Sequence, residues 1–122
     1  TVSCVNAPAQ YAALAALDGP QEIIGEMRDA YRERRDEARR ILSSSGIPAL
    51  EPAGAFYIWI DISSSGRSDV AFAMDLVDKH QVAVVPGSTF GPGNEDRVRI
   101  SLATAPNLLY EGIRRLIQET RS

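Results

Sequence analysis

Arg99 is the residue whose type and position best fit the binding of a charged ligand. Residues 98–103 read Val-Arg-Ile-Ser-Leu-Ala, a pattern typical of a β-strand. Alternation along a strand places Arg99 on the same face as Ser101 and Ala103, and these small side chains leave space in front of the guanidinium. A guanidinium in such a space can bind a carboxylate through two parallel, charge-assisted hydrogen bonds. The pattern alone favours the simpler alternative, an arginine on the solvent-exposed face of a half-buried strand.

The other residues that could do chemistry do not form a recognisable catalytic or metal site. His80 is the only histidine; one histidine cannot build a metal cluster, and we expect a surface residue at the end of a helix. Cys4 is the only cysteine, so no internal disulfide can form, and we expect a small buried thiol in a reducing compartment. The glycine-rich loop 86–93 lacks the lysine of a phosphate-binding loop, and no helix begins directly after it, which favours a tight turn. The sequence therefore predicts no catalytic residue and no metal site in this chain.

Length and composition limit the chain to one globular domain or one large piece of a longer protein. It has 122 residues, of which 44% are apolar and 24% charged, and its net charge is −3. That charge argues against a nucleic-acid-binding module, which normally has a basic face. No run of about 18 apolar residues is present, which excludes a membrane span. The N-terminus lacks a secretory signal, so we expect a cytoplasmic protein; it also lacks an initiator methionine, so we expect cleavage or trimming there.

The N-terminal third of the chain is predicted to form two helices of different character. Residues 11–17, Tyr-Ala-Ala-Leu-Ala-Ala-Leu, form a short helical block that begins near Ala7. This block is apolar on nearly every side, so it needs to be covered by other structure. A long helix is predicted from about Pro20 to Ser44, with apolar residues at spacings of three and four and a mixed-charge face exposed to solvent. Gly46 is expected to end it in the left-handed conformation.

The remaining residues are predicted to form three strands and two helices. The elements are a strand at 55–62, a helix at 68–79 capped by Ser68, strands at 82–86 and 98–103, and a final helix capped by Asn107. We expect the strand at 82–86 to be buried. This order predicts an α+β fold, an α/β sandwich in which a small three-stranded sheet is covered by helices and preceded by the long helix.

Five stretches, taken together, resemble one enzyme family. They are VNAPAQYAALAAL (5–17), RRD (34–36), PAGAFYIWIDIS (52–63), VAVVPGSTFG (82–91) and VRISLA (98–103). Their order and spacing resemble the C-terminal part of fold-type I pyridoxal-phosphate enzymes, the class I/II aminotransferases related to aspartate aminotransferase. The resemblance implies that residues 1–19 are a remnant of the large domain, 20–46 a long interdomain helix, and 47–122 a small C-terminal domain.

The resemblance also implies roles for individual residues. Arg99 matches the family arginine that binds the α-carboxylate of the amino-acid substrate, which reverses the preference given by the strand pattern. Gly54 and Phe56 match a segment that shapes the substrate pocket. A loop near the active-site mouth matches at Pro86, Gly87 and Phe90. No catalytic or cofactor-binding residue of the family has a counterpart in this chain.

The intact enzyme is thereby expected to use pyridoxal 5'-phosphate, with amino-acid and 2-oxo-acid substrates, as a homodimer. The family's Schiff-base lysine lies upstream of this sequence, and Lys79, the only lysine, does not match its motif. We therefore expect the chain alone to bind no cofactor and to be inactive. Two alternatives stay open: an isolated, non-catalytic module that self-associates through residues 1–17, or the same domain of a fold-type I lyase, decarboxylase or regulator.

Overall fold

The computed structural model describes residues 4–122, which fall into two compact units, Thr1–Ala30 and Tyr31–Ser122. Helix α2 (Glu22–Ser44) belongs to both units and is the covalent link between them. Helix α1 (Ala7–Asp18) lies wholly in the first unit. The division into a large-domain remnant, an interdomain helix and a small domain stays a prediction.

The first unit presents an apolar surface that nothing within it covers. Asn6 caps α1 by accepting a hydrogen bond from the amide of Ala9 at 2.9 Å. No residue of α1 is buried, and the side chains of Tyr11 and Leu17 are 75% and 77% exposed. The predicted all-round apolar helix is therefore present. No helix among residues 4–122 is both long and apolar enough to cross a membrane.

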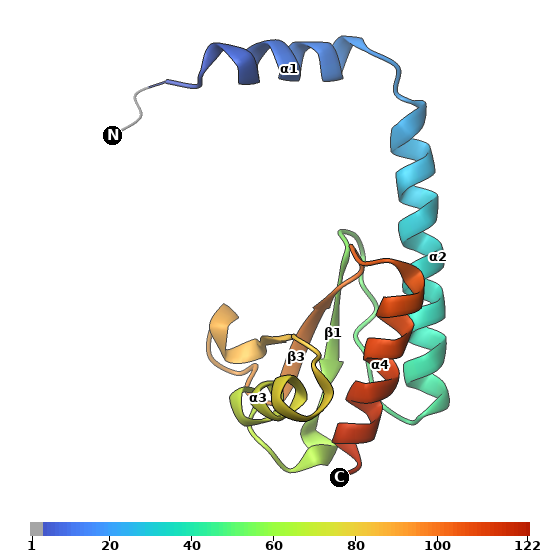
Figure 1. The fold of residues 1–122 in the computed structure, drawn as a ribbon, viewed down its shortest axis with the longest axis vertical. Helices are drawn as coiled ribbons and strands as arrows, with labels where there is room; N and C mark the ends of the chain where they lie inside the picture. Colours follow the sequence, from blue (N-terminus) through green and yellow to red (C-terminus); the bar gives the residue numbers. More distant parts are fainter. Residues whose placement is uncertain (1–3) are drawn as a thin grey trace. The chain divides into compact units, whose positions relative to one another are not determined.

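A three-stranded antiparallel sheet forms the centre of the second unit. The strands are β1 (Tyr57–Asp61), β2 (Val85–Pro86) and β3 (Arg97–Ser101), in the order β1-β3-β2. Figure 1 shows β1 and β3 side by side. Because β3 lies in the middle, its residues Val98 and Arg99 have strand neighbours on both sides. Arg99 pairs with Trp59 of β1 and with Val85 of β2.

The prediction of a buried strand over 82–86 is wrong in length and in burial. Only Val85 and Pro86 pair with β3, and the side chain of Val85 is exposed. The amide of Val82 donates instead to the carbonyl oxygen of Leu76, at the end of the preceding helix. The first residues of this segment therefore complete a helix terminus, and they are not available to a strand partner.

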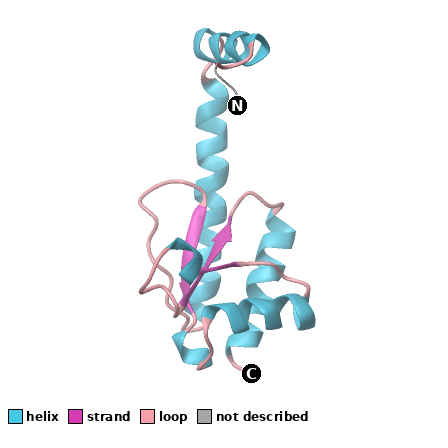
Figure 2. Cartoon of the chain, turned by 90° about the vertical axis from the view of Figure 1, so that its left-hand side faces the viewer, coloured by secondary structure: helices cyan, strands magenta, loops and turns pink. Residues whose placement is uncertain are grey.

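Helices cover one face of the sheet, as the α+β prediction requires (Figure 2). They are the C-terminal part of α2, α3 (Asp69–His80) and α4 (Pro106–Thr120). Two short 3₁₀ turns, η1 (Ser63–Ser65) and η2 (Gly87–Phe90), complete the unit. The predicted caps at Ser68 and Gly46 are confirmed, since Ser68 accepts a hydrogen bond from the third residue of α3 and Gly46 has a φ of 75°.

The prediction of Asn107 as a helix cap is wrong. Helix α4 begins at Pro106, and Ala105 takes the capping position without a side-chain hydrogen bond. The proline ring fixes the backbone angle of the first helical residue and needs no hydrogen-bond partner for its nitrogen. Asn107 therefore lies inside the first turn of the helix.

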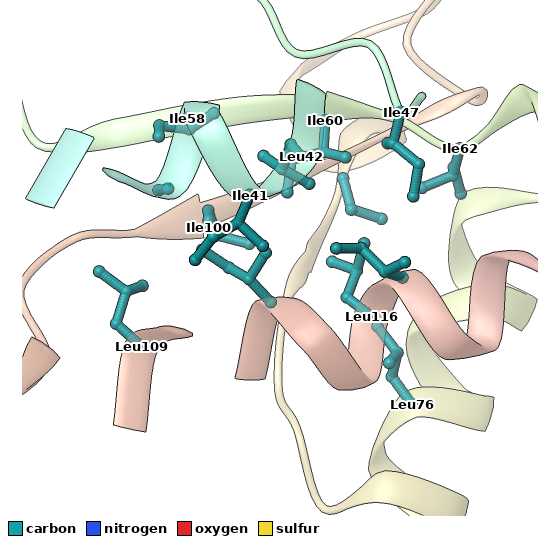
Figure 3. Packing of buried hydrophobic residues seen from close by; sticks show 14 of the residues in the cluster. Ile41, Leu42, Ile47, Ile58, Ile60, Ile62, Leu76, Ile100, Leu109 and Leu116 are labelled. Carbon is teal, nitrogen blue, oxygen red and sulfur yellow. The ribbon is translucent and has the colours of Figure 1, made fainter. Parts of the chain in front are cut away.

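The core lies between this face of the sheet and the three helices (Figure 3). The strands contribute alternate residues, as a period of two requires. The core includes the following side chains, all under 9% exposed: Ile41 and Leu42 of α2, Ile58 and Ile60 of β1, Phe72 and Leu76 of α3, Val98 and Ile100 of β3, and Leu109, Ile113 and Leu116 of α4. The opposite face of the sheet carries Arg99, and the 3₁₀ turn η2 brings Phe90 against it.

A buried carboxylate joins the C-terminal turn of α4 to α3 and to the loop that precedes α3. The side chain of Glu119 is 1% exposed and contacts the guanidinium of Arg67, Lys79 Nζ at 3.1 Å and His80 Nε2 at 2.9 Å. His80 is therefore a largely buried hydrogen-bonding residue, and the prediction of a surface residue is wrong because α4 packs against the end of α3. Burial alone would raise the pKa of Glu119, but the hydrogen bonds from Arg67, His80 and Lys79 outweigh it and lower the pKa to about 2.

Acid is expected to remove the stabilisation that ionised Glu119 provides. Folding lowers its pKa from 4.5 to about 2, so between these pH values the unfolded chain binds more protons than the folded chain. The contribution is complete above this window and is lost as the pH falls through it, by up to about 1.4 kcal/mol per pH unit. Urea melts at a series of pH values should show this loss in the free energy of unfolding. Glu119→Gln should lack this part of the pH dependence, and an unchanged slope in the variant would contradict the assignment.

Candidate functional site

Arg99 lies in the middle of the central strand, on the sheet face opposite the hydrophobic core. Its neighbours Val98 and Ile100 are buried in the core, and its own side chain is half-buried on the opposite face. The predicted alternation of β3 is therefore confirmed. The adjacent strands place Trp59 and Val85 directly beside it.

Two aromatic rings contact the guanidinium of Arg99. Its Cζ atom lies 4.0 Å from the ring centroid of Tyr57 and 4.0 Å from that of Phe90. The ring of Phe90 in turn meets Trp59 edge to face, with centroids 5.2 Å apart. Cation–π contacts of this kind hold an arginine in one place without neutralising its charge.

The guanidinium has hydrogen-bonding capacity that the described residues do not use. Arg99 Nε is buried and has no hydrogen-bond partner within residues 4–122. None of the carboxylates in that range pairs with this arginine. An arginine stays protonated at any working pH, and a buried N–H group without a partner is costly. The site is therefore suited to an anion that comes from outside the described residues, and a carboxylate matches the planar fork of donors.

The sequence pattern contained a signal for one of the two rings and not for the other. Tyr57 and Trp59 alternate with Ile58 and Ile60, so the strand period places both aromatic residues on the Arg99 face. Phe90 comes from the loop after β2, and loops have no period from which a side chain's position could be read. Two aromatic rings thus lie directly against the guanidinium, where the small side chains of Ser101 and Ala103 had led us to expect open space.

The loop that carries Phe90 leaves no room for a side chain at its first residue. A Cβ atom on Gly87 would clash with the backbone oxygens of Asn94 and Arg97. The amide of Ser88 donates to Asp69 Oδ2 at 2.7 Å, and Thr89 Oγ1 donates to the Pro86 carbonyl oxygen at 2.7 Å. We call residues 87–96 the η2 loop.

Gly87→Ala is expected to distort the η2 loop and to destabilise the chain by about 1–3 kcal/mol, the usual cost of forcing extra volume into a packed site. Gly54→Ala is the matched control, because a Cβ atom there would meet nothing within 4 Å. Urea melts measure the free energy of unfolding of both variants. Equal stability of the two would show that the η2 loop tolerates a side chain at Gly87.

The structure places Phe56 close to the site and Gly54 in the loop that leads to it. The ring of Phe56 lies 4.4 Å from that of Tyr57 and 5.8 Å from that of Tyr31, measured between centroids, so it extends the aromatic row that begins at Arg99. Gly54 has open space where a side chain would be, and Ala55 after it has a φ of 61°, which is strained for a residue with a Cβ atom. The roles of Phe56 and Gly54 in shaping a pocket stay predictions.

The remaining candidates lie outside this cluster. Cys4 is exposed, and the prediction of a buried thiol is wrong because it precedes α1 in the first unit, which buries little of its surface. No group of three histidine, cysteine, aspartate or glutamate side chains within the described part of the chain could hold a metal ion.

Sequence comparison places the chain in a family of enzymes. The family "Aminotransferase class I and II" matches residues 1–116, and the chain belongs to it. A putative aminotransferase of Bacillus subtilis is 41% identical over 113 residues, which are 93% of this chain and 29% of that protein. A probable aspartate/prephenate aminotransferase of Aquifex aeolicus is 44% identical over 123 residues, covering 95% of this chain and 30% of that protein.

Solved structures agree with this membership. An aspartate aminotransferase from Thermotoga maritima is 35% identical, with a TM-score of 0.87 over all of this chain and 30% of that one. An aromatic aminotransferase from Pyrococcus horikoshii is 40% identical, with a TM-score of 0.83 over 89% of this chain and 30% of that one. The chain thus spans about 30% of the length of the relatives that it matches.

The family implies pyridoxal phosphate as cofactor, and the surroundings of Lys79, the only lysine of the sequence, do not suit a covalent bond to it. A lysine that bonds covalently to the cofactor must lose its proton to act as a nucleophile. Lys79 Nζ lies 3.1 Å from Glu119 Oε1 and 3.2 Å from Asp75 Oδ2. The hydrogen bonds that Lys79 donates to Glu119 and Asp75 raise the pKa of Lys79 above its ordinary value. Lys79 therefore stays protonated and serves the structure of the α3–α4 contact.

Proposed function

We propose that this chain is the C-terminal part of a pyridoxal-phosphate-dependent aminotransferase, and that Arg99 binds the α-carboxylate of its amino-acid and 2-oxo-acid substrates. The observation that carries the proposal is the buried, unpartnered Nε of Arg99, on a guanidinium fixed by two aromatic rings. Family membership supplies the reaction class.

The contribution of Arg99 to such a reaction is positional. A carboxylate held by two parallel hydrogen bonds has a fixed orientation, so the rest of the substrate is presented to the reacting groups in one direction only. Tyr57 and Phe90 contact the guanidinium through their rings, which leaves its charge and its Nε–H group available for the substrate.

We infer that the cofactor and its lysine are contributed by sequence upstream of Thr1. In that arrangement residues 1–19 belong to the large domain, residues 20–46 link the domains, and residues 47–122 form the small domain. The exposed apolar surface of α1 supports this division, because such a surface needs a cover. Homodimerisation and a cytoplasmic location are part of the same proposal.

The chain alone is expected to bind no pyridoxal phosphate in a defined site and to have no aminotransferase activity. After incubation with stoichiometric cofactor and gel filtration, no cofactor absorbance above 300 nm should remain with the protein. The Lys79→Arg variant is the control for adventitious adducts at that amine. A stoichiometric band that remains with the chain and disappears in Lys79→Arg would contradict the expectation.

The exposed face of α1 favours a second behaviour for the isolated chain, which is self-association. Tyr11, Leu14 and Leu17 are each more than half exposed, and apolar surface of this kind promotes association. Sedimentation of the chain and of a Leu14→Glu, Leu17→Glu variant would compare their masses. A monomeric parent chain would remove this alternative.

The reaction class is tested with the intact protein that contains this chain. An amino acid labelled with ¹⁵N is mixed with an unlabelled 2-oxo acid, and the products are followed by mass spectrometry. Transfer of the label to the new amino acid supports an aminotransferase. Release of ammonia or carbon dioxide without transfer would point to a lyase or a decarboxylase, which can also use an arginine that binds an α-carboxylate.

A further inference from the structure

Asp69 is a buried carboxylate that has no cationic partner among residues 4–122. Its side chain belongs to a residue that is 2% exposed at the first position of α3. Burial alone would raise the pKa of Asp69, but the hydrogen bonds that its carboxylate accepts from Ser88 contribute to outweighing it, and the pKa is lowered. A charge kept ionised in this way is fixed by the groups that donate to it.

Asp69 forms hydrogen bonds with both ends of the η2 loop. Its Oδ2 atom accepts a hydrogen bond from the amide of Ser88 at 2.7 Å, on the arm that leaves β2. Its own amide donates to the carbonyl oxygen of Glu95 at 3.0 Å, on the arm that returns to β3. One residue of α3 therefore forms hydrogen bonds with the η2 loop at two points, Ser88 and Glu95.

Helix capping does not account for this arrangement. Ser68 already occupies the capping position of α3 and accepts a hydrogen bond from Ala71 at 3.3 Å. The contact of Asp69 with Ser88 crosses from the helix to a different element, which a capping residue does not need to do.

The η2 loop places Phe90 on the guanidinium of Arg99. Ser88 is two residues before Phe90, and the ring centroid of Phe90 lies 4.0 Å from Arg99 Cζ. We propose that Asp69 is a positioning residue for Arg99: by fastening the η2 loop, it holds the ring of Phe90 against the guanidinium and so orients the carboxylate-binding group. The functional half of this statement rests on the proposed role of Arg99.

Nuclear magnetic resonance of the ¹⁵N,¹³C-labelled chain tests the structural half. Stacked rings shift nearby protons upfield, so the δ-methylene protons of Arg99 should resonate upfield of ordinary arginine values, with the signal assigned by its absence in Arg99→Lys. Asp69→Ala should lose most of this upfield shift. Asp69→Asn keeps the side-chain volume and removes the charge, so it should lose a smaller part, and it decides the test if the alanine variant does not fold.

Asp75→Asn is the matched control, because it makes the same chemical change on the same helix. Asp75 contacts Arg67 and Lys79 and none of the η2 loop. An Arg99 signal that moves in the Asp69 variants and stays in Asp75→Asn supports the inference. A signal that does not move in any folded Asp69 variant, or moves equally in Asp75→Asn, overturns it.

Kinetics of the intact enzyme test the functional half. Asp69→Asn should raise KM for the amino acid and for the 2-oxo acid by up to about tenfold, the usual net worth of one ordinary hydrogen bond, with bound cofactor unchanged. Wild-type values of KM in Asp69→Asn, together with a displaced Arg99 signal, would overturn the link between the loop and the substrate. A separate result would show that Arg99 does not bind the substrate carboxylate. In that case Arg99→Lys would bind substrate normally, while the Asp69 variants would still displace Phe90.

Discussion

Replacing Arg99 by alanine in the intact enzyme is expected to raise KM for the amino-acid substrate by about 30-fold or more. The reason is that truncating one partner of a hydrogen-bonded charge pair costs about 2–5 kcal/mol of binding free energy. The KM of Arg99→Lys should fall between those of the parent enzyme and Arg99→Ala, because an ammonium keeps the charge and loses the planar fork of donors. Steady-state kinetics with several amino acids would show the same factor for each, since all carry the same carboxylate.

The cofactor content of these variants separates binding of the substrate from folding of the protein. Arg99 lies on a sheet face opposite the core, so its loss should leave cofactor loading unchanged. Arg97→Ala is the matched control on the same strand: Arg97 has Asp96 as a partner, with Arg97 Nε 3.6 Å from Asp96 Oδ1. If Arg99→Ala and Arg97→Ala had the same KM as the parent enzyme, Arg99 would not be the carboxylate-binding residue.

Glu119→Gln is expected to be the most destabilising single change of a charged residue in the second unit. Breaking a buried ion pair costs about 3–5 kcal/mol when the remaining charge stays buried. The side chains of Arg67 and Lys79 are 25% and 51% exposed, so water can solvate part of their charge after the change. We therefore expect a loss of about 2–3 kcal/mol in the free energy of unfolding of the chain, measured by urea melts at pH 7.

Glu111→Gln in the same helix is the control for this change. Glu111 pairs with Arg114 and Arg115 at the surface, and exposed pairs of this kind contribute less than about 1 kcal/mol. The loss in the free energy of unfolding should thus be several times larger for Glu119→Gln than for Glu111→Gln. Equal effects at the two positions would mean that the contacts of the buried carboxylate contribute no more than surface pairs.

How much of the site could be predicted from the sequence depends on the kind of signal that each residue carries. The alternation of Val98, Ile100 and Leu102 fixed the face on which Arg99 lies, and the strand pattern was correct. The proposed role of Arg99 as a carboxylate-binding residue came from the resemblance to the family. Pattern alone favoured an ordinary exposed arginine, because it could not show that rings surround the guanidinium.

Residues whose roles depend on contacts between distant segments gave no signal. Asp69 looks like any acidic residue in the first turn of a helix, and only the fold brings Ser88 of the η2 loop to its carboxylate. Glu119 looks like a surface residue near the end of a helix, yet it is buried by groups that lie some 40 to 50 positions earlier in the chain. Periodicity reports on the residues of one element and does not report which elements meet.

The errors in element boundaries have local physical causes. Pro106 begins α4, which moves the cap from Asn107 to Ala105. Val82 completes α3 by donating to Leu76, which shortens the strand that was predicted from its β-branched residues. In both cases the hydrogen bonding at a helix terminus determined the boundary of the element. The intrinsic preference of the residues for a strand or a cap did not determine it.

The central claim is that Arg99 recognises the α-carboxylate, and a thermodynamic cycle tests it most directly. The dissociation constants of an amino acid and of the amine that lacks only its carboxylate are measured on the intact enzyme and on its Arg99→Ala variant. We expect the parent enzyme to favour the amino acid by about 30-fold or more. In the variant this preference should shrink to within about twofold, which is the usual limit of additivity. A variant that keeps the full preference would contradict the assignment of Arg99.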